Sequence, residues 1–390
     1  GGFRLRYGRG RVSGLSSASM HPITQFLLNN YIALGTQLKV ERPGKAAAIM
    51  TCDTIDGPIV KLMNGDVLQL NAHQEYNQHK AEIKEILYLG DILFNYGDFS
   101  ENNHKLVPPG YCDEWWMLEL EKAIVSMFGS LDRAKLSEFA ELTDEETASL
   151  FERPNFSSSA DACIRISSLT KISLHPKFTL FWNSISQKEL AELIDWIPST
   201  KIIRENNLIT KLIFPYNPDK KSLFEKLGLP HKLASNEFVV VEGDWARVFA
   251  LNLHLENKTT EEISEIVASN QEKDVLSIIN LISPLPIKDK CGTFIGARMG
   301  RPEKAKMRAL TGSPHVLFPV GDEGGRLRSI QAALLTGNIT ADFPLNICRN
   351  CGKETIFNVC EMCESQTQKR HYCKNCGLVE GEVCEKCGEK

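Results

Sequence analysis

Cys348-Arg-Asn-Cys351, Cys360-Glu-Met-Cys363, Cys373-Lys-Asn-Cys376 and Cys384-Glu-Lys-Cys387 decide the fold of the C-terminal end of this 390-residue chain. Each Cys-x-x-Cys pair can direct two thiolates at one ion, and two pairs complete a tetrahedral site of four sulfurs. The spacing of paired hairpins favours zinc over an iron–sulfur cluster or redox-active pairs, and four sulfurs leave no position open for catalysis. We therefore predict two structural Zn²⁺ sites with the cysteines paired in sequence order; an interleaved arrangement is the alternative.

The remaining cysteines are scattered, at Cys52, Cys112, Cys163 and Cys291. A secreted disulfide scaffold spreads its cysteines through a small domain and carries a targeting signal, and neither feature is seen here. We expect a reducing, cytoplasmic location. With 42% apolar and 24% charged residues the composition is that of a folded protein, and no run approaches the roughly 20 apolar residues of a membrane span. The start, Gly1-Gly-Phe3, has neither an initiator Met nor a signal peptide, so we expect a piece of a longer protein.

The order of apolar segments and turn signals divides the chain. Residues 1–111 are predicted to be mostly β, with a hairpin at Asn64-Gly65 in a type I′ turn and short helices at 22–29 and 81–89. Residues 112–285 are predicted to be a mainly helical α+β region, because Thr143, Ser186 and Thr259 each begin a capping box. We expect the pair Trp115-Trp116 in its core, and a platform for stacked bases is the alternative interpretation. Residues 286–340 return to β and turn character, and residues 341–390 hold the two four-cysteine modules.

The stretch Gly296–Arg308 carries five basic residues and one acid, although the whole chain has a net charge of −4. Its glycines and its proline predict a shaped loop that lets the backbone approach a phosphate, while Arg and Lys supply the positive charge. A solvated basic loop is the other interpretation. The basic residues are Arg298, Arg301, Lys304, Lys306 and Arg308.

Further basic groups point to the same kind of anionic partner. Arg4, Arg6, Arg9 and Arg11 stand without an acid in the first eleven residues. The alternation Arg4-Leu5-Arg6-Tyr7 would place arginines on one face of a strand, where they could follow a phosphate backbone or the RNA-like minor groove of a primer–template duplex. The other interpretation is a solvated strand edge. Lys39, Arg42 and Lys45 form another group, and Arg326 follows two glycines. We predict DNA contacts at these positions and at Arg308.

Several of these segments together resemble the large subunit of archaeal DNA polymerase D, a two-subunit replicative polymerase. The resemblance is carried by Gly1–Arg9, Gly35–Lys45, Asn95–His104, the Gly296–Arg308 loop and the cysteine quartets, and is weaker over 112–285. It implies an α+β fold in which a double-psi β-barrel, interrupted by an inserted helical region, is followed by two small zinc-ribbon-like modules. It also implies a DNA-directed DNA polymerase, in which basic residues of this barrel face Mg²⁺-binding aspartates of a second barrel.

By the same resemblance, Lys304 and Lys306, with Arg298 and Arg301 beside them, are the candidate active-site residues that neutralise the triphosphate or the primer backbone. The family's Asn-Ala-Asp-Phe-Asp-Gly-Asp metal motif is not present, and Thr340-Ala-Asp-Phe-Pro344 shares only a short string with it. We therefore expect the catalytic Mg²⁺ to be held by residues outside this chain, and we expect the chain alone to be inactive.

The implied partners are primer–template DNA, dNTPs, a small subunit that carries a 3′–5′ exonuclease, and a sliding clamp. A non-catalytic zinc-containing nucleic-acid-binding or scaffold protein on the same barrel is the alternative. An RNA polymerase or a transcription-factor zinc ribbon is a weaker third interpretation, because the resemblance extends well beyond the cysteines.

Overall fold

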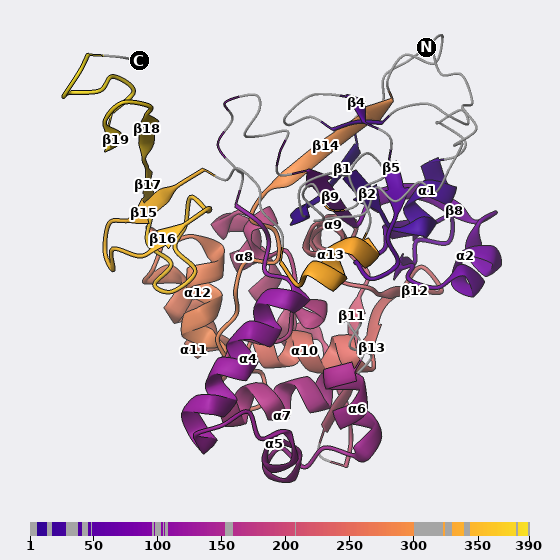
Figure 1. Ribbon diagram of the computed structural model, residues 1–390. Helices are drawn as coiled ribbons and strands as arrows, with labels where there is room; N and C mark the ends of the chain where they lie inside the picture. The colour runs from indigo at the N-terminus through magenta and orange to yellow at the C-terminus, as the bar shows by residue number, and fades with distance from the viewer. Residues whose placement is uncertain are drawn as a thin grey trace.

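The computed structural model describes residues 6–13, 18–28, 38–40, 46–47, 49–95, 97, 103, 105, 108–152, 159–206, 208–299, 323, 330–338, 344–379 and 381–388. Helices and strands are mixed in one α+β chain, with a sheet region near the N-terminus, helices below it in Figure 1, and a small β-rich extension at the C-terminus. The expected α+β class is therefore confirmed.

The largest sheet has seven strands in the order β4-β3-β14-β1-β9-β2-β5. Its strands are β1 (Arg6–Ser13), β2 (Ala18–Met20), β3 (Leu38–Val40), β4 (Ala46–Ala47), β5 (Ile49–Thr51), β9 (Asp91–Asn95) and β14 (Phe294–Met299). β1 runs parallel to β9 and antiparallel to β14, so the sheet is mixed. Among the described residues the strands form an open order and do not close, so the double-psi barrel stays a prediction.

A second, three-stranded sheet packs beside the first. It contains β6 (Ile59–Leu62), β7 (Val67–Gln69) and β8 (Ile83–Tyr88) in the order β7-β6-β8. The predicted hairpin at Asn64-Gly65 is confirmed, but its turn type is not, because only Gly65 of the two has a positive φ, of 94°. Helices α1 (Pro22–Leu28) and α2 (His73–His79) flank this part, and the buried side chains of Ile23, Val60 and Phe94 share one core.

The helix predicted over 81–89 is wrong, because residues Ile83–Tyr88 are strand β8. Its apolar residues fit a helical period over so short a run, but pairing with β6 decides the outcome, with Val60 opposite Ile86 and Leu62 opposite Ile83. Ile86 is thereby buried against the first sheet's core.

A helical layer follows, formed by α4 (Asp113–Phe128), α5 (Arg133–Phe139), α6 (Asp144–Glu152) and α7 (Ala160–Thr170). Trp116, Leu120 and Ile124 recur at helical spacing on α4 and are fully buried, and the Trp116 indole donates to the Ser173 carbonyl at 3.0 Å. The expectation that Trp115 and Trp116 belong to the core is confirmed, with Trp116 fully buried and Trp115 partly buried against the same core. Leu118, by contrast, is 66% exposed on the other side of the helix.

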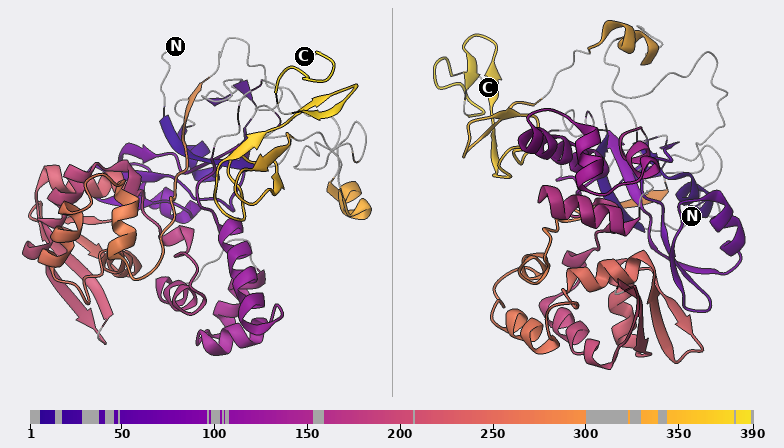
Figure 2. Two further views of the ribbon diagram at one scale, coloured as in Figure 1. Left: turned by 90° about the vertical axis from the view of Figure 1, so that its left-hand side faces the viewer. Right: turned by 90° about the horizontal axis from the view of Figure 1, so that it is seen from below.

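Next comes an α+β module with its own core. Its antiparallel sheet has the order β10-β11-β13-β12. The 3-10 turn η1 (Pro176–Phe178) precedes the module and belongs to the core of the helical layer through Phe178. The elements of the module are the 3-10 turns η2 (Trp182–Ser184) and η3 (Ile197–Ser199), the helices α8 (Gln187–Ile194), α9 (Pro218–Leu227), α10 (Asp244–Asn252), α11 (Thr260–Ala268) and α12 (Val275–Ile282), and the strands β10 (Lys201–Glu205), β11 (Leu208–Pro215), β12 (Lys232–Ala234) and β13 (Phe238–Glu242). Both views of Figure 2 place the helices on one side of these strands.

The three predicted helix starts are confirmed by their side-chain hydrogen bonds. Ser186 and Glu189 form a reciprocal capping box at α8, and Thr259 and Glu262 do so at α11. At α6 the Thr143 amide donates to Glu146 at 3.0 Å, and the Glu146 amide donates to the Thr143 hydroxyl at 3.1 Å.

The α+β module is joined to the N-terminal sheets by direct contacts. Val67 of β7 and His231 exchange backbone hydrogen bonds of 2.8 and 3.1 Å, and the Lys61 ammonium lies 2.8 Å from a Glu225 carboxylate oxygen. The Tyr88 ring lies 4.6 Å from that of Phe181, between ring centroids. The long region between β9 and β14 is therefore packed against the sheets from which it departs.

The last elements are a short helix and five small strands. They are α13 (Ile330–Thr336), β15 (Asn346–Cys348), β16 (Glu354–Thr355), β17 (Thr367–Lys369), β18 (His371–Cys373) and β19 (Gly377–Val379). β16-β15-β17 form one sheet and β18-β19 another. Over the described part of the chain, each helix is too short or too polar to cross a bilayer.

Candidate functional site

The eight C-terminal cysteines form two compact quartets. Cys348, Cys351, Cys360 and Cys363 make one, and Cys373, Cys376, Cys384 and Cys387 make the other, with the sulfurs of each quartet within 4.8 Å of one another. The cysteines are thus grouped in sequence order, as predicted. Sulfur–sulfur distances are 3.3 Å for Cys348–Cys363 and 3.5 Å for Cys351–Cys360 and Cys373–Cys387.

These distances suit a tetrahedral zinc ion. A Zn–S bond of about 2.3 Å requires sulfurs about 3.8 Å apart, close to the separations found. The donor set is all sulfur, and each quartet contributes two buried thiols, Cys348 and Cys360 in the first and Cys373 and Cys384 in the second. Each quartet could therefore hold a zinc ion, and its closed set of four ligands fits a structural role.

The backbone around each pair prepares the sulfurs as ligands. Gly352, Gly377 and Gly388 follow cysteines with φ of 72°, 83° and 75°, a conformation that favours glycine. The amides of Asn350 and Cys351 donate to the Cys348 sulfur at 3.4 and 3.5 Å. The turn thus directs two N–H groups at a sulfur that must carry negative charge when it binds metal.

Nearby donors lower the pKa of two thiols of the first quartet, whereas hydrogen bonds with the Cys360 and Cys348 sulfurs raise the pKa of Cys351 to about 12. Hydrogen bonds from the Cys351 and Asn350 amides lower the pKa of Cys348. Hydrogen bonds from the Ser365 side chain and amide lower the pKa of Cys363 to about 6. Because the thiolate is the metal-binding form, these contacts favour metal binding at neutral pH.

The first quartet is attached to the helical layer through Lys288. The Lys288 ammonium lies 2.5 Å from a Glu119 carboxylate oxygen on α4 and 2.6 Å from one of Glu364, next to Cys363. It also lies 4.7 Å from the centre of a Trp115 ring. These contacts place the first four-cysteine module against α4.

The candidate basic segments lie on neighbouring strands of the large sheet. β14, which contains Arg298, runs between β1 and β3. Arg298 is directly opposite Lys39 in the β14–β3 pair, and Arg6 is opposite Ala297 in the β14–β1 pair. Three basic segments that are far apart in sequence are therefore brought together by backbone pairing. Arg11 continues along β1, opposite Leu93 of β9.

Other predicted site residues cannot be placed in this way. Those that lie outside the described residues are Arg4, Arg42, Lys45, Arg301, Lys304, Lys306, Arg308 and Arg326.

Arg9 is an exception to the predicted basic surface, because its side chain is only 3% exposed. Its guanidinium Nε and Nη2 bind the Asp91 carboxylate at 2.5 and 2.7 Å. Nη1 donates to the carbonyls of Tyr111 and Lys290, at 3.0 and 3.3 Å. Arg9 therefore lies in the core, where it connects the first sheet to both ends of the 112–289 segment, and we leave it out of the proposed DNA-contacting residues.

The sequence reasoning missed the partners of Arg9. Asp91 is buried at the start of β9, and the buried Lys290 ammonium lies 3.4 Å from an Asp56 carboxylate oxygen. Burial lowers the pKa of Lys290, and the carboxylate of Asp56 opposes that shift. No local motif marks these residues, because the charges meet only after β1, β9 and the segment before β14 are assembled.

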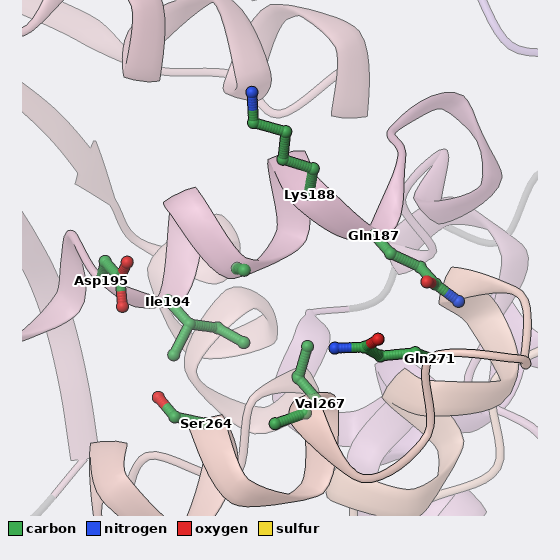
Figure 3. Close-up of a pocket in the computed structure, with 9 residues that line it drawn as sticks. Gln187, Lys188, Ile194, Asp195, Ser264, Val267 and Gln271 are labelled. Atoms are coloured by element: carbon green, nitrogen blue, oxygen red, sulfur yellow. The ribbon is translucent and has the colours of Figure 1, made fainter.

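A cleft of about 420 Å³ lies between α8 and α11. Gln187 and Gln271 approach one another at one end, while the Lys188 amine points away and Asp195 lies at the other end (Figure 3). Its charged side chains do not converge on a common point. We therefore assign the cleft no chemistry.

Comparison with known proteins identifies the family. The family model described as "DNA polymerase II large subunit DP2, central domain" matches residues 1–381. The DNA polymerase II large subunit of Archaeoglobus fulgidus is 38% identical over 399 residues, covering 100% of this chain and 32% of the relative. That of Nanoarchaeum equitans is 35% identical over 392 residues, covering 96% and 31%.

A third relative, the DNA polymerase II large subunit of Thermococcus kodakarensis, is 35% identical over 400 residues, covering 97% of this chain and 22% of the relative. The chain thus spans a third or less of the length of these relatives. The match extends through both the sheet region and the cysteine modules. The chain therefore belongs to the family of the DNA polymerase II large subunit, as its central domain.

Proposed function

We propose that this chain is part of the catalytic large subunit of an archaeal replicative DNA-directed DNA polymerase, and that its basic strands bind the phosphates of primer–template DNA and incoming dNTP. The observation that carries the proposal is the meeting of β1, β14 and β3, which brings Arg6, Arg298 and Lys39 onto adjacent strands. Family membership and the names of the relatives support it.

Phosphate binding follows from this concentration of charge. A forked guanidinium can donate two parallel hydrogen bonds to a phosphate, and a lysine ammonium supplies a compact charge. Arg298 lies in β14, and the Gly300–Arg308 part of the basic segment follows that strand directly. In our proposal, Lys304 and Lys306, with Arg298 and Arg301, neutralise charge at the reacting phosphates, while Arg4, Arg6, Arg11, Lys39, Arg42, Lys45, Arg308 and Arg326 contact DNA.

The reaction we propose is transfer of a nucleotide to the primer 3′ hydroxyl. Mg²⁺, held by aspartates outside this chain, would supply the activation of that hydroxyl and stabilise the pyrophosphate. The contribution of this chain is to orient the triphosphate and offset its negative charge. Accordingly, the 390 residues alone should bind DNA without extending it.

The finer architecture belongs to the same proposal. We propose that residues 1–111 and 286–340 form a double-psi barrel, that 112–285 is inserted into it, and that 341–390 carries two structural zinc ions. The pairing of β14 with β1 and β3, across the whole inserted region, supports this division. A small exonuclease subunit and a sliding clamp are the proposed protein partners, and the cytoplasm is the proposed location.

Binding of primer–template DNA to the chain tests the proposal. Arg298→Ala and Lys39→Ala should each weaken binding and reduce the slope of log affinity against log salt by about 0.9 for each phosphate that is no longer neutralised. Lys188→Ala, which removes an 87% exposed lysine from α8, is the matched control and should change neither quantity. Affinity and salt slope that are the same in all three variants and in the wild type would refute the basic-strand assignment.

A further inference from the structure

The second four-cysteine module presents an exposed aromatic and aliphatic pair on its hairpin. Tyr372 of β18 is directly opposite Leu378 of β19, and the two side chains are 73% and 53% exposed. Cys373, the next residue after Tyr372, is buried at the metal-ligand side. Because successive strand residues point to opposite faces, Tyr372 and Leu378 lie on the face turned away from the cysteine sulfurs.

The segment 365–379, which contains this pair, is basic, although Glu364 precedes it and Glu380 follows it. Residues 365–379 contain Lys369, Arg370 and Lys374 and no Asp or Glu. Lys369 and Lys374 are exposed on either side of Tyr372 in the sequence. A chain with a net charge of −4 therefore has an acid-free basic segment at this hairpin.

The hairpin is also placed for access. Whereas the first module is held against α4 through Lys288 and Glu364, β18 and β19 lie at the outer edge of the molecule in Figures 1 and 2. Among the described residues, the strand contacts of β18 and β19 are with each other. The exposed pair is thus available to a ligand without movement of the helical layer.

We propose that the β18–β19 hairpin binds single-stranded nucleic acid, with an unpaired base stacked on Tyr372 and against Leu378, and with Lys369 and Lys374 at the adjoining phosphates. An aromatic ring flanked by cations matches the two parts of a single strand, its π-faced bases and its anionic backbone. The absence of acids over 365–379 favours this polyanion over a protein partner of mixed charge.

This inference goes beyond the proposed function, because it assigns a second nucleic-acid site that is separate from the basic strands β1, β3 and β14. The two can fail separately. Removal of the Tyr372 ring would leave phosphate binding by β1, β3 and β14 unchanged. Removal of a basic residue from those strands would likewise leave base stacking on Tyr372 unchanged.

The test is fluorescence anisotropy of the zinc-loaded 390-residue chain with labelled oligothymidylate. Tyr372→Ala should weaken binding about 10-fold, because the platform for one stacked base is removed, and should leave the salt slope unchanged. Tyr372→Trp should keep the affinity. Lys374→Ala should reduce the salt slope by about 0.7, the value for one phosphate of a single strand.

Matched controls and a second readout make the outcome decisive. Tyr216→Ala removes a 38% exposed tyrosine from outside the hairpin and should not weaken binding. Zinc content establishes that each variant has kept its metal sites. Photocrosslinking of an iodouracil-containing strand should modify the peptide that contains Tyr372.

Three results would overturn the proposal. In the first, Tyr372→Ala binds oligothymidylate as tightly as the wild type does. In the second, the crosslinks fall wholly outside the β18–β19 hairpin. In the third, Tyr372→Ala loses the same affinity for blunt duplex as for single strand, which would exclude base stacking. Unchanged nucleic-acid affinity combined with failed assembly of the complete enzyme would assign Tyr372 to a protein contact instead.

Discussion

Arg9 and Asp91 form a two-pronged ion pair inside the protein, with Nε–Oδ1 and Nη2–Oδ2 distances of 2.5 and 2.7 Å. Both side chains are almost fully buried, at 3% and 1% exposure. The same guanidinium binds the carbonyls of Tyr111 and Lys290, which stand at the two ends of the 112–289 segment. One side chain thus connects β1, β9 and both connections to the inserted region.

Removing one partner of this pair should strongly destabilise the fold. Arg9→Ala leaves the Asp91 carboxylate buried without its counter-charge, which should lower the free energy of unfolding by about 3–5 kcal/mol. Urea unfolding measures the change. Arg204→Ala, at an exposed arginine of β10, is the control and should stay within about 0.5 kcal/mol of wild type. Equal stability of the two variants would show that the pair is not structural.

Gly110 should tolerate no side chain. A Cβ at this position would lie 2.1 Å from the Lys290 carbonyl oxygen and 3.1 Å from the Arg9 side chain. Gly110→Ala should therefore displace the connection into α4 and lower the melting temperature. At Gly381 the nearest atom would lie 3.7 Å away, so Gly381→Ala is the control that should melt like the wild type. A Gly110→Ala protein with the wild-type melting temperature would contradict this.

Two buried histidines should make the fold sensitive to acid. Burial, helped by Lys177 and Lys290, lowers the pKa of His175 to about 3, and burial with Lys221 lowers that of His231 to about 3. The unfolded chain, with an ordinary histidine pKa of 6.5, then binds more protons than the folded chain between pH 6.5 and 3. Each histidine's contribution is complete above pH 6.5 and is lost as the pH falls through that window.

Variants separate this effect from other acid-sensitive groups. His231→Gln should flatten the dependence of unfolding free energy on pH by up to about 1.4 kcal/mol per pH unit, measured by urea unfolding from pH 7 to pH 4. His73→Gln, at an exposed histidine of α2, should keep the wild-type slope. If His231→Gln also keeps it, the neutral buried form of His231 is wrong.

The cysteine quartets predict the metal content of the purified chain. We expect two equivalents of tightly held zinc, and Cys351→Ser and Cys376→Ser should each lose one, because each breaks a different quartet. Cys52→Ser, outside both quartets, should keep two. Zinc content by mass spectrometry decides the matter, and fewer than two equivalents in the wild type would argue against two structural sites.

Signals that act within a few residues predicted the structure well. The Cys-x-x-Cys pairs and the capping boxes at Ser186 and Thr259 depend on local spacing, and all are found. The segment 81–89 depends instead on its pairing with β6, which no local pattern contains, and its predicted helix is a strand. At Asn64-Gly65, local sequence predicted the hairpin. The turn type differs because the loop is longer than a two-residue turn and is closed by a hydrogen bond from the Leu62 amide to the Asp66 carbonyl.

For the candidate site, too, local features could be predicted from the sequence and long-range contacts could not. The composition of the basic segments was readable in the sequence, whereas their meeting on β1, β14 and β3 required the register of distant strands. For Arg9, charge alone suggested a surface residue. Arg9 is instead buried, because its guanidinium pairs with the carboxylate of Asp91, which lies 82 positions away in the sequence.

The central claim is that the basic segment following β14 acts at the reacting phosphates. Single-turnover primer extension by the proposed two-subunit enzyme tests it, with Lys304→Ala and Lys306→Ala compared with Lys188→Ala. Loss of a charge that stabilises the transition state should slow nucleotide addition by about 100-fold or more, with little change in primer–template affinity. Wild-type rates in both Lys304→Ala and Lys306→Ala would contradict the account and leave these lysines outside the active site.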